Sequence, residues 1–213
     1  MKIHIKIIAL ILLFTAYSCS KKDDEDKNFQ ACATVISESP NDTIVSEEDQ
    51  NLAENLFNAN QIDYANLQIT KVQKDKYGNA HIRCNQFMNG LQIFTSDLIF
   101  HFDEKDEYAP VSGDLVNEIH LDNQSSLDND ISTSLYLNEV QNDSFYKFKI
   151  NEIIKNCLDL QFGYYDLNAG ISYKPLNIVK AWKITPHNKG YPVLYVNDAT
   201  SEIIYYHNGI IIN

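Results

Sequence analysis

The sequence predicts an α+β protein in which a helix followed by antiparallel strands occurs twice. Apolar residues recur at helical spacing over 52–57 and again over 150–158. Each of these stretches precedes short apolar runs that are separated by turn residues, as in β-hairpins. Helices kept apart from antiparallel strands in this way are typical of the α+β class.

The chain begins with the features of a cleaved signal peptide, over residues 1–18. Lys2 and Lys6 give a basic start, residues 7–14 are apolar and uncharged, and small residues follow. The apolar run is shorter than the about 20 residues that a membrane-spanning helix needs. A buried N-terminal helix is the alternative, but the highly charged residues 20–27 would then have to follow it into a core.

Residues 16–19, Ala-Tyr-Ser-Cys, resemble the lipobox of bacterial lipoproteins, with Ala16 where Leu is typical. The resemblance implies that Cys19 is the lipid attachment site. Its thiol would carry a diacylglyceryl group and its freed amine an acyl chain such as palmitate. Because two or three acyl chains hold a protein firmly on a membrane, we expect the mature chain to contact the membrane through Cys19.

Residues 19–45 are polar, and we predict that they form a lipid-anchored acidic tether. The acidic run at 23–26 resembles the export tag of surface lipoproteins in some Gram-negative bacteria. This resemblance implies an outer-membrane lipoprotein that is exposed on the cell surface. A periplasm-facing outer-membrane anchor is the alternative, because runs of like charge are also typical of ordinary solvated tethers.

The charge of the chain excludes nucleic acid as a partner. There are 17 basic and 29 acidic residues, and loss of residues 1–18 would take two lysines and change the formal net charge from −12 to −14. Phosphate binding needs clustered Lys and Arg, and Arg83 is the only arginine. Arg83 and Gln86 point to opposite faces of an expected strand. We expect Arg83 to form a structural ion pair, with a ligand contact through these residues as the alternative.

The first half, residues 46–125, is predicted to be one α+β subdomain. Ser46 and Asp49 have the spacing of a capping box at the start of a helix that ends near 58–60. Asn89-Gly90 is the strongest hairpin signal, because both residues tolerate positive φ. Strands or extended segments are expected at 67–72, 80–88, 91–94, 98–102, 108–111 and 114–121.

The polar stretch 123–130 marks a boundary, and residues 126–213 are predicted to form a second subdomain. A short helix is expected over 131–140, and the apolar stripe at 150–158 predicts another, ended by Gly163 or by the turn near Gly170. Later strands are expected at 178–185, 191–197 and 202–207. The apolar tail at 209–213 is predicted to be a last strand, with insertion into a partner's cleft as the alternative.

Three cysteines besides Cys19 remain in the mature chain: Cys32, Cys84 and Cys157. An exported protein can form disulfides, and three thiols allow at most one bridge in any of three pairings. The alternative is that all three are small buried apolar residues. The sequence leaves both possibilities open.

No arrangement of residues typical of a catalytic or metal site is present. The chain contains no H-E-x-x-H, G-x-S-x-G or P-loop sequence. His81, His101 and His120 lie on expected strands at similar spacing and would converge only if the sheet brought them together. Because sheet-surface histidines are the simpler interpretation, we expect no catalytic residue, no metal and no cofactor.

Residues 81–103 resemble the fungalysin/thermolysin propeptide motif. The stretch has Arg83, Gln86 and a turn at Gly90, followed by apolar strands that end in Asp103. The motif belongs to the prosegment of thermolysin-like metallopeptidases, which assists folding of the enzyme and blocks its active-site cleft.

Residues 180–205 resemble the PepSY domain, which occurs in the same prosegments. Trp182 lies on one expected strand and a second strand ends in Asp198-Ala-Thr-Ser-Glu, with Ser201 where Gly is usual. Together the two resemblances imply two cystatin-like subdomains, each a helix packed on an antiparallel sheet.

The resemblance implies a free-standing, non-catalytic lipoprotein that binds a secreted or surface protease, such as a metallopeptidase, and inhibits or chaperones it. A surface lipoprotein that binds glycan or peptide is the alternative, and a purely structural envelope module is another. Binding of glycan or peptide is supported by the surplus of tyrosines, namely Tyr164, Tyr165, Tyr173, Tyr191, Tyr195, Tyr205 and Tyr206. Most of these would be core residues or cross-strand pairs in an ordinary sheet.

Overall fold

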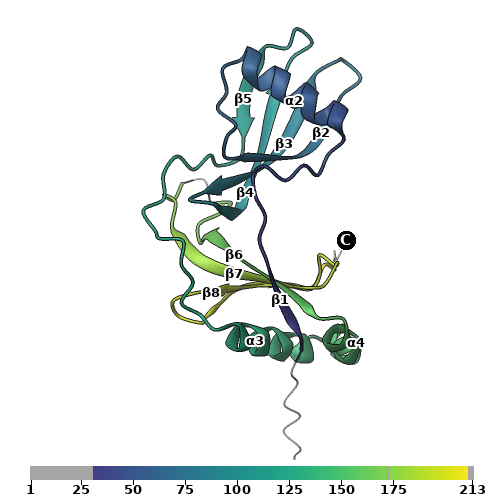
Figure 1. Ribbon diagram of the computed structural model, residues 1–213, viewed down its shortest axis with the longest axis vertical. Helices are drawn as coiled ribbons and strands as arrows, with labels where there is room; N and C mark the ends of the chain where they lie inside the picture. Colours follow the sequence, from purple (N-terminus) through teal and green to yellow (C-terminus); the bar gives the residue numbers. More distant parts are fainter. Residues whose placement is uncertain (1–30, 172, 211–213) are drawn as a thin grey trace, which may run out of the picture.

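The computed structural model describes residues 31–171 and 173–210 (Figure 1). The predicted signal peptide, Cys19 and the acidic run at 23–26 lie outside these residues. None of the helices in the described ranges has the length and apolar character needed to cross a membrane. The elements in chain order are β1 (Ala33–Ile36), α2 (Glu47–Ala59), β2 (Leu67–Lys74), β3 (Ala80–Met88), β4 (Leu91–Phe102), β5 (Tyr108–Ser112), α3 (Asn129–Asn142), the 3₁₀ helix η1 (Lys147–Lys149), α4 (Ile150–Lys155), β6 (Leu158–Asp166), β7 (Ile178–Pro186), β8 (Val193–Asn197) and β9 (Ile203–His207).

The predicted α+β class is confirmed. The strands form one sheet in the order β2-β3-β4-β6-β7-β8-β9, with β5 paired to β4 and β1 paired to β6. Figure 1 shows two lobes: a first lobe of α2 and β2–β5, and a second lobe of β1, α3, η1, α4 and β6–β9. In each lobe the helices cover one face of the strands. The lobes share the sheet where Ile93 of β4 runs parallel to Tyr164 of β6.

Helix α2 forms where the capping pattern predicts it. The Ser46 hydroxyl accepts a hydrogen bond from the Asp49 backbone N–H at 3.1 Å, which satisfies a donor at the helix start. The buried face of the helix includes Leu56 and Phe57, and the Phe57 ring lies 5.1 Å from that of Phe100 on β4. This contact attaches α2 to the first-lobe strands.

Strand β4 belongs to both lobes, which the sequence did not predict. We expected separate strands at 91–94 and 98–102, but β4 is continuous from Leu91 to Phe102. Asn85 of β3 lies opposite Asp97 while Gln86 lies opposite Ile93, so residues 94–96 bulge out of the pairing. The bulge bends β4, and its two ends pair with β6 and β5.

The tether prediction for 19–45 is wrong over β1. Residues 33–36 pair in parallel with residues 158–161 of β6, and Cys32 forms a disulfide with Cys157 just before that strand. The stretch Ala-Thr-Val-Ile has the β-branched residues that strands favour, but its polar flanks hide it in the sequence. The start of the described chain is therefore part of the second lobe.

The helix expected over 150–158 is shorter than predicted. Helix α4 ends at Lys155, Cys157 has a φ of 64°, and Leu158 begins β6. The apolar spacing continues into the strand, because Leu158 is buried in the same core as the helix. Gly163, which we expected to break a helix, instead lies inside β6, and the segment expected to be extended at 114–121 forms no strand.

Asp198, in the turn between β8 and β9, holds the connection between the lobes in place. Its buried carboxylate accepts hydrogen bonds from Ser125, Ser126 and Leu127 of that connection, and from the indole N–H of Trp182. Burial opposes ionisation of Asp198, but the hydrogen bonds from Ser126 and its neighbours outweigh it and lower the pKa of the carboxyl. The Asp198-Ala-Thr-Ser-Glu turn singled out in the sequence therefore has a structural role.

Candidate functional site

Arg83, the lone arginine, forms an exposed ion pair. Its Nε lies 3.0 Å from Oδ1 of Asp97 on the neighbouring strand β4. About half of each side chain is exposed, so the pair contributes at most about 1 kcal/mol to stability.

Gln86 is buried and connects three segments of the first lobe. Its side-chain nitrogen donates to the carbonyl of Val116, and its carbonyl oxygen accepts from the Val116 N–H at 3.0 Å and from the Ser96 hydroxyl at 3.1 Å. The Gln86 amide thus pairs with both backbone groups of Val116, as a neighbouring strand would, and its contact with Ser96 stabilises the β4 bulge. All of its hydrogen bonds are internal to the protein.

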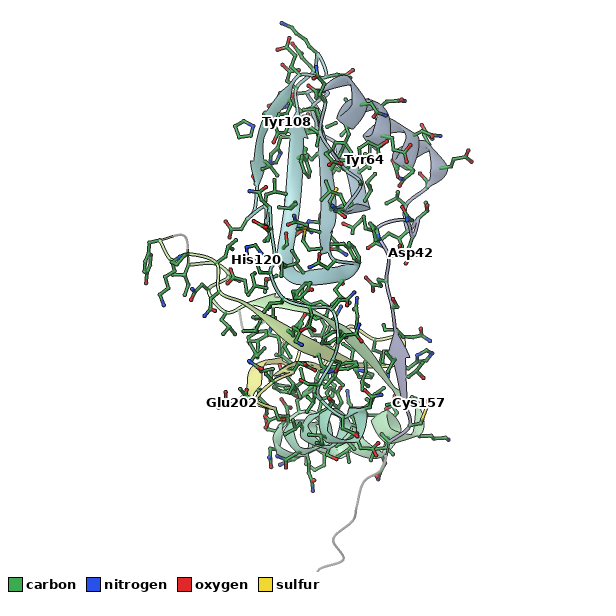
Figure 2. The ribbon with its side chains drawn as sticks, turned by 60° about the vertical axis from the view of Figure 1, so that its left-hand side comes forward. Asp42, Tyr64, Tyr108, His120, Cys157 and Glu202 are labelled. Atoms are coloured by element: carbon green, nitrogen blue, oxygen red, sulfur yellow. A yellow bond between two sulfur atoms is a disulfide. The ribbon has the colours of Figure 1, made fainter. Side chains whose placement is uncertain are left out.

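Two of the three histidines on the first half meet. His81 and His101 face each other across β3 and β4, with their Nδ1 atoms 2.8 Å apart, and His101 Nε2 lies 2.9 Å from the Ser112 hydroxyl. His120 lies apart, exposed beside Glu118 in the connection between the lobes (Figure 2). Within the described part of the chain, no three His, Cys, Asp or Glu side chains are placed to share a metal ion.

Among the residues that the structure describes, no helix covers one of the two faces of the second-lobe sheet (Figure 1). The face toward α3 and α4 contains the buried residues Leu160, Ile184 and Leu194. The opposite face, which we call the open face, carries Tyr165, Tyr191, Tyr195, Tyr205 and His207. Their rings form a continuous series, with centroids 5.0 Å apart for Tyr165 and Tyr195, 6.4 Å for Tyr195 and Tyr205, 6.0 Å for Tyr205 and His207, and 5.2 Å for His207 and Tyr191.

The bulge of β4 extends this series from the first lobe. The ring of Phe94 lies 5.6 Å from that of Tyr195, and the Lys183 ammonium lies 5.8 Å from the Phe94 ring. Gly163 makes this approach possible, because a Cβ at that position would stand only 2.6 Å from the Phe94 ring. The open face is therefore built by both lobes.

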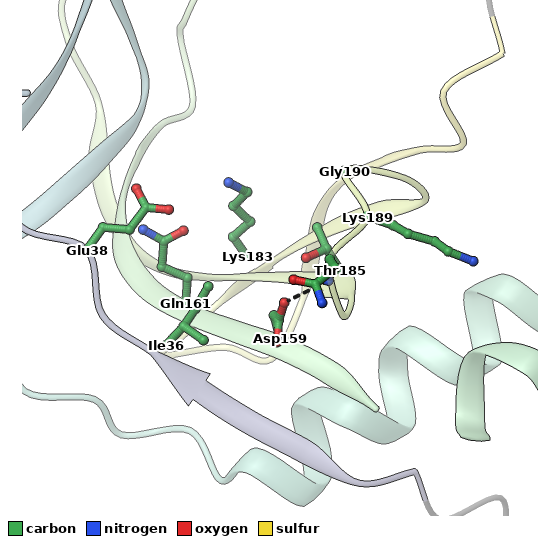
Figure 3. A pocket seen from close by; sticks show the side chains of 9 residues that line it. Ile36, Glu38, Asp159, Gln161, Lys183, Thr185, Lys189 and Gly190 are labelled. Carbon is green, nitrogen blue, oxygen red and sulfur yellow. Dashed lines mark hydrogen bonds between the residues drawn. The ribbon is translucent and has the colours of Figure 1, made fainter. Parts of the chain in front are cut away.

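A hollow of about 280 Å³ lies on the same side of the second-lobe sheet, next to the end of β1 (Figure 3). Gln161 of β6 is 3% exposed and donates to the Gln92 carbonyl oxygen at 2.8 Å, while its own carbonyl oxygen has no partner. A buried acceptor of this kind is rare unless a ligand or water completes it. The hollow is lined by Ile36, Glu38, Asp159, Gln161, Lys183, Thr185, Asn188, Lys189 and Gly190.

The open face carries neutral hydroxyl groups and aromatic rings. Burial, with smaller effects from Tyr165 and other tyrosines, raises the pKa of Tyr195 to about 12, so its hydroxyl stays neutral and able to donate. The aromatic rings offer stacking surfaces, and the hollow beside them is lined by charged side chains such as Lys183 and Asp159. Cys84 is the free thiol among the described residues, but burial raises its pKa to about 12, which makes it a poor nucleophile.

The tyrosine surplus noted in the sequence divides between the two faces. Tyr165, Tyr191, Tyr195 and Tyr205 gather on the open face, whereas Tyr164 and Tyr206 lie on the other side of the sheet and Tyr173 is exposed on a loop. Gln161 and Lys183 were not singled out in the sequence. The signal that would have found Gln161 is the two-residue alternation of β6, which was hidden because that strand was not recognised. Lys183 lies on β7, which the sequence did predict, and the alternation there places it on the face opposite Trp182.

Comparison with known proteins bears on the first lobe. Residues 65–115 match the family model described as the fungalysin/thermolysin propeptide motif, which confirms the resemblance seen around Arg83 and Gln86. Among curated proteins no match is found. A solved structure, the Bacillus megaterium YpeB C-terminal domain, is similar with a TM-score of 0.39 and 8% identity, covering 82% of this chain and 70% of that one. A likeness at that level supports no conclusion about function.

Proposed function

We propose that this chain is a non-catalytic protein that binds a secreted or surface protease and inhibits it or assists its folding. The observation that carries the proposal is the match of residues 65–115 to the propeptide motif. The matched stretch runs from just before β2 to just past β5, and so includes every strand of the first lobe. A zinc metallopeptidase of the fungalysin or thermolysin type is the partner that this motif favours.

The open face is the surface that we assign to the partner. It combines exposed aromatic rings with a hollow lined by polar side chains such as Lys183 and Asp159, and protein interfaces are enriched in such aromatic side chains. Tyr191 and Tyr205 are 49% and 44% exposed, which leaves large apolar rings available for burial by a partner. Strand addition at the free edge of β9 is compatible with the same surface.

We also propose that the chain is anchored in the outer membrane through lipids on Cys19, and that it faces the cell exterior. The lipobox-like sequence and the acidic run at 23–26 support this placement. A periplasm-facing anchor is the alternative. Mass spectrometry of the native N-terminal peptide tests the anchor, because an unmodified Cys19 thiol or an uncleaved leader contradicts it.

A pull-down with the full mature chain, carrying Cys19→Ser, tests the partner against purified secreted proteases of the source organism. We expect a metallopeptidase to be retained by this chain, and to be retained less by Tyr205→Ala. Tyr77→Ala is the matched control, because Tyr77 is 68% exposed on the β2–β3 turn, away from the open face. Equal retention by all three proteins would contradict the assignment of the open face, and no retention by any would contradict the function.

A glycan or peptide ligand is the second candidate, and the series of stacked rings from Phe94 to Tyr191 favours it. Flat aromatic surfaces with nearby hydroxyl donors are suited to stacking on sugars or on apolar side chains. Binding to a glycan array that is lost in Tyr205→Ala, together with no effect on any protease, would favour this candidate over the first.

A further inference from the structure

The described chain begins at the helical end of the second lobe. Ala31 is buried in the same core as Tyr136 and Val140 of α3, and the Cys32–Cys157 disulfide fixes the next residue beside the end of α4. Figure 2 shows Cys157 at this end of the molecule, far from Tyr108 in the first lobe. Any anchor N-terminal to Ala31 is therefore joined to the protein at the α3–α4 layer.

The segment between α3 and α4 exposes aromatic rings in alternation with lysines. It reads Phe145-Tyr146-Lys147-Phe148-Lys149, which we call the aromatic–lysine segment. Phe148 is 82% exposed and Phe145 is 48% exposed. The Lys147 ammonium lies 5.0 Å from the Phe148 ring, and the Lys149 ammonium lies 4.6 Å from the Phe145 ring.

We propose that the aromatic–lysine segment rests in the interface of the lipid bilayer that holds the protein, an inference that rests on the proposed lipid anchor at Cys19. The 12 residues from Cys19 to Gln30 span at most about 40 Å, so the membrane surface is within reach of the helical end. Aromatic rings at the boundary of the acyl chains and lysines at the level of the phosphates are the arrangement that interfacial segments adopt.

With the lipid anchor in place, even a weak affinity of the aromatic–lysine segment for the bilayer is enough to keep it in contact. Two exposed phenylalanines and two lysines alone bind a bilayer only weakly and reversibly. A short tether holds the segment near the surface at an effective concentration on the order of millimolar, so even weak insertion is populated. Contact through α3, η1 and α4 would direct the first lobe away from the membrane and leave the open face, on the opposite side of the sheet from these helices, free for a partner (Figure 1).

Fluorescence quenching by lipid tests this contact directly. The mature chain, made without lipid, is coupled through its Cys19 thiol to maleimide lipid in phosphatidylethanolamine/phosphatidylglycerol vesicles, and Phe148 is replaced by Trp. The single native Trp182 is 4% exposed and supplies a constant background. We expect brominated acyl chains to reduce the added emission of Phe148→Trp by roughly half, as an interfacial ring requires.

Tyr77→Trp is the matched control, because Lys76 lies 4.9 Å from the Tyr77 ring and reproduces the lysine–aromatic pair at the β2–β3 turn of the first lobe. Its emission should be unaffected by brominated lipid. Equal quenching of Phe148→Trp and Tyr77→Trp would overturn the proposal. So would an unquenched Phe148→Trp together with loss of protease binding in Phe148→Ser, because the aromatic–lysine segment would then contact a protein. The coupling is chemical, so failure of natural lipidation or of protease binding does not alter this readout.

Discussion

At the scale of single residues, Asp198 has a structural role in the turn that the PepSY resemblance singled out. The Asp198 side chain is fully buried. Its carboxylate accepts hydrogen bonds from the connection between the lobes and from Trp182. Removing the Asp198 carboxylate would leave these donors buried and unpaired, which would destabilise the folded protein.

Replacing Asp198 with Asn should lower the free energy of unfolding by about 2–4 kcal/mol, because an amide offers one acceptor oxygen and sets its own N–H groups against those of Ser126 and Leu127. Asp97→Asn is the control, since it breaks only the exposed pair with Arg83 and should cost less than about 1 kcal/mol. Urea unfolding of both variants measures this. Equal stabilities for the two would contradict the role given to Asp198.

The same carboxylate predicts the acid sensitivity of the fold. Burial opposes ionisation at both Asp198 and Asp143, but hydrogen bonds from Ser126 and Tyr146 respectively outweigh it, and both folded pKa values lie below 3.8. Since a lowered pKa favours the ionised folded form, this stabilisation is complete above about pH 4 and is lost as the pH falls through the folded pKa values. Unfolding measured from neutral pH down to about pH 2 should show the loss, and Asp198→Asn should flatten it.

Cys84 gives a residue-scale prediction of reactivity. Its thiol is fully buried and burial raises its pKa to about 12, so it should resist maleimide in the folded protein. In a Cys19→Ser chain, we expect no labelling before reduction, labelling of Cys32 and Cys157 after reduction, and labelling of Cys84 only in denaturant. Rapid labelling of Cys84 in the native state, detected by peptide mass, would contradict its burial.

At the scale of elements, strand β1 depends on its disulfide. The bond between Cys32 and Cys157 closes a loop with a sequence separation of 125, and such a loop predicts a loss of up to about 4 kcal/mol when it is opened. Reduction should speed amide hydrogen exchange in β1 and in the paired residues 158–161 of β6. Exchange in β2 and β3 should stay unchanged, and protection of β1 that survives reduction would contradict the prediction.

The elements also show which parts of the fold a sequence can predict. The start of α2 and the Asn89-Gly90 turn depend on local chemistry, namely a capping hydroxyl and two residues with positive φ, and both are confirmed. β1 pairs with β6 far along the chain, and the apolar spacing of the preceding helix continues into β6, so local patterns did not identify either strand. The tyrosines of the site were noticed, but placing Tyr165 on the same face as Tyr195 and Tyr205 required β6 to be recognised as a strand.

At the scale of the whole molecule, one continuous sheet joins the lobes at Gly163. Gly163→Ala would place a Cβ 2.6 Å from both the Gln92 carbonyl oxygen and the Phe94 ring, and should cost about 1–3 kcal/mol by overpacking. Gly190→Ala is the control, because a Cβ there meets nothing within 4 Å. Thermal unfolding compares the two. We also expect Gly163→Ala to weaken partner binding, since it displaces Phe94 from the open face. Equal stability of the two variants would contradict the close approach.

The central claim is that the chain binds a protease of the fungalysin or thermolysin type without being an enzyme itself. The most direct test adds the mature Cys19→Ser chain to a thermolysin-type catalytic domain that lacks its own prosegment, and follows peptide hydrolysis together with the yield of refolded enzyme. We expect hydrolysis to fall, or the refolded yield to rise, in proportion to the added chain. Tyr205→Ala should weaken the effect, whereas Tyr77→Ala should not. Rates and yields unchanged at saturating concentrations of the chain would contradict it.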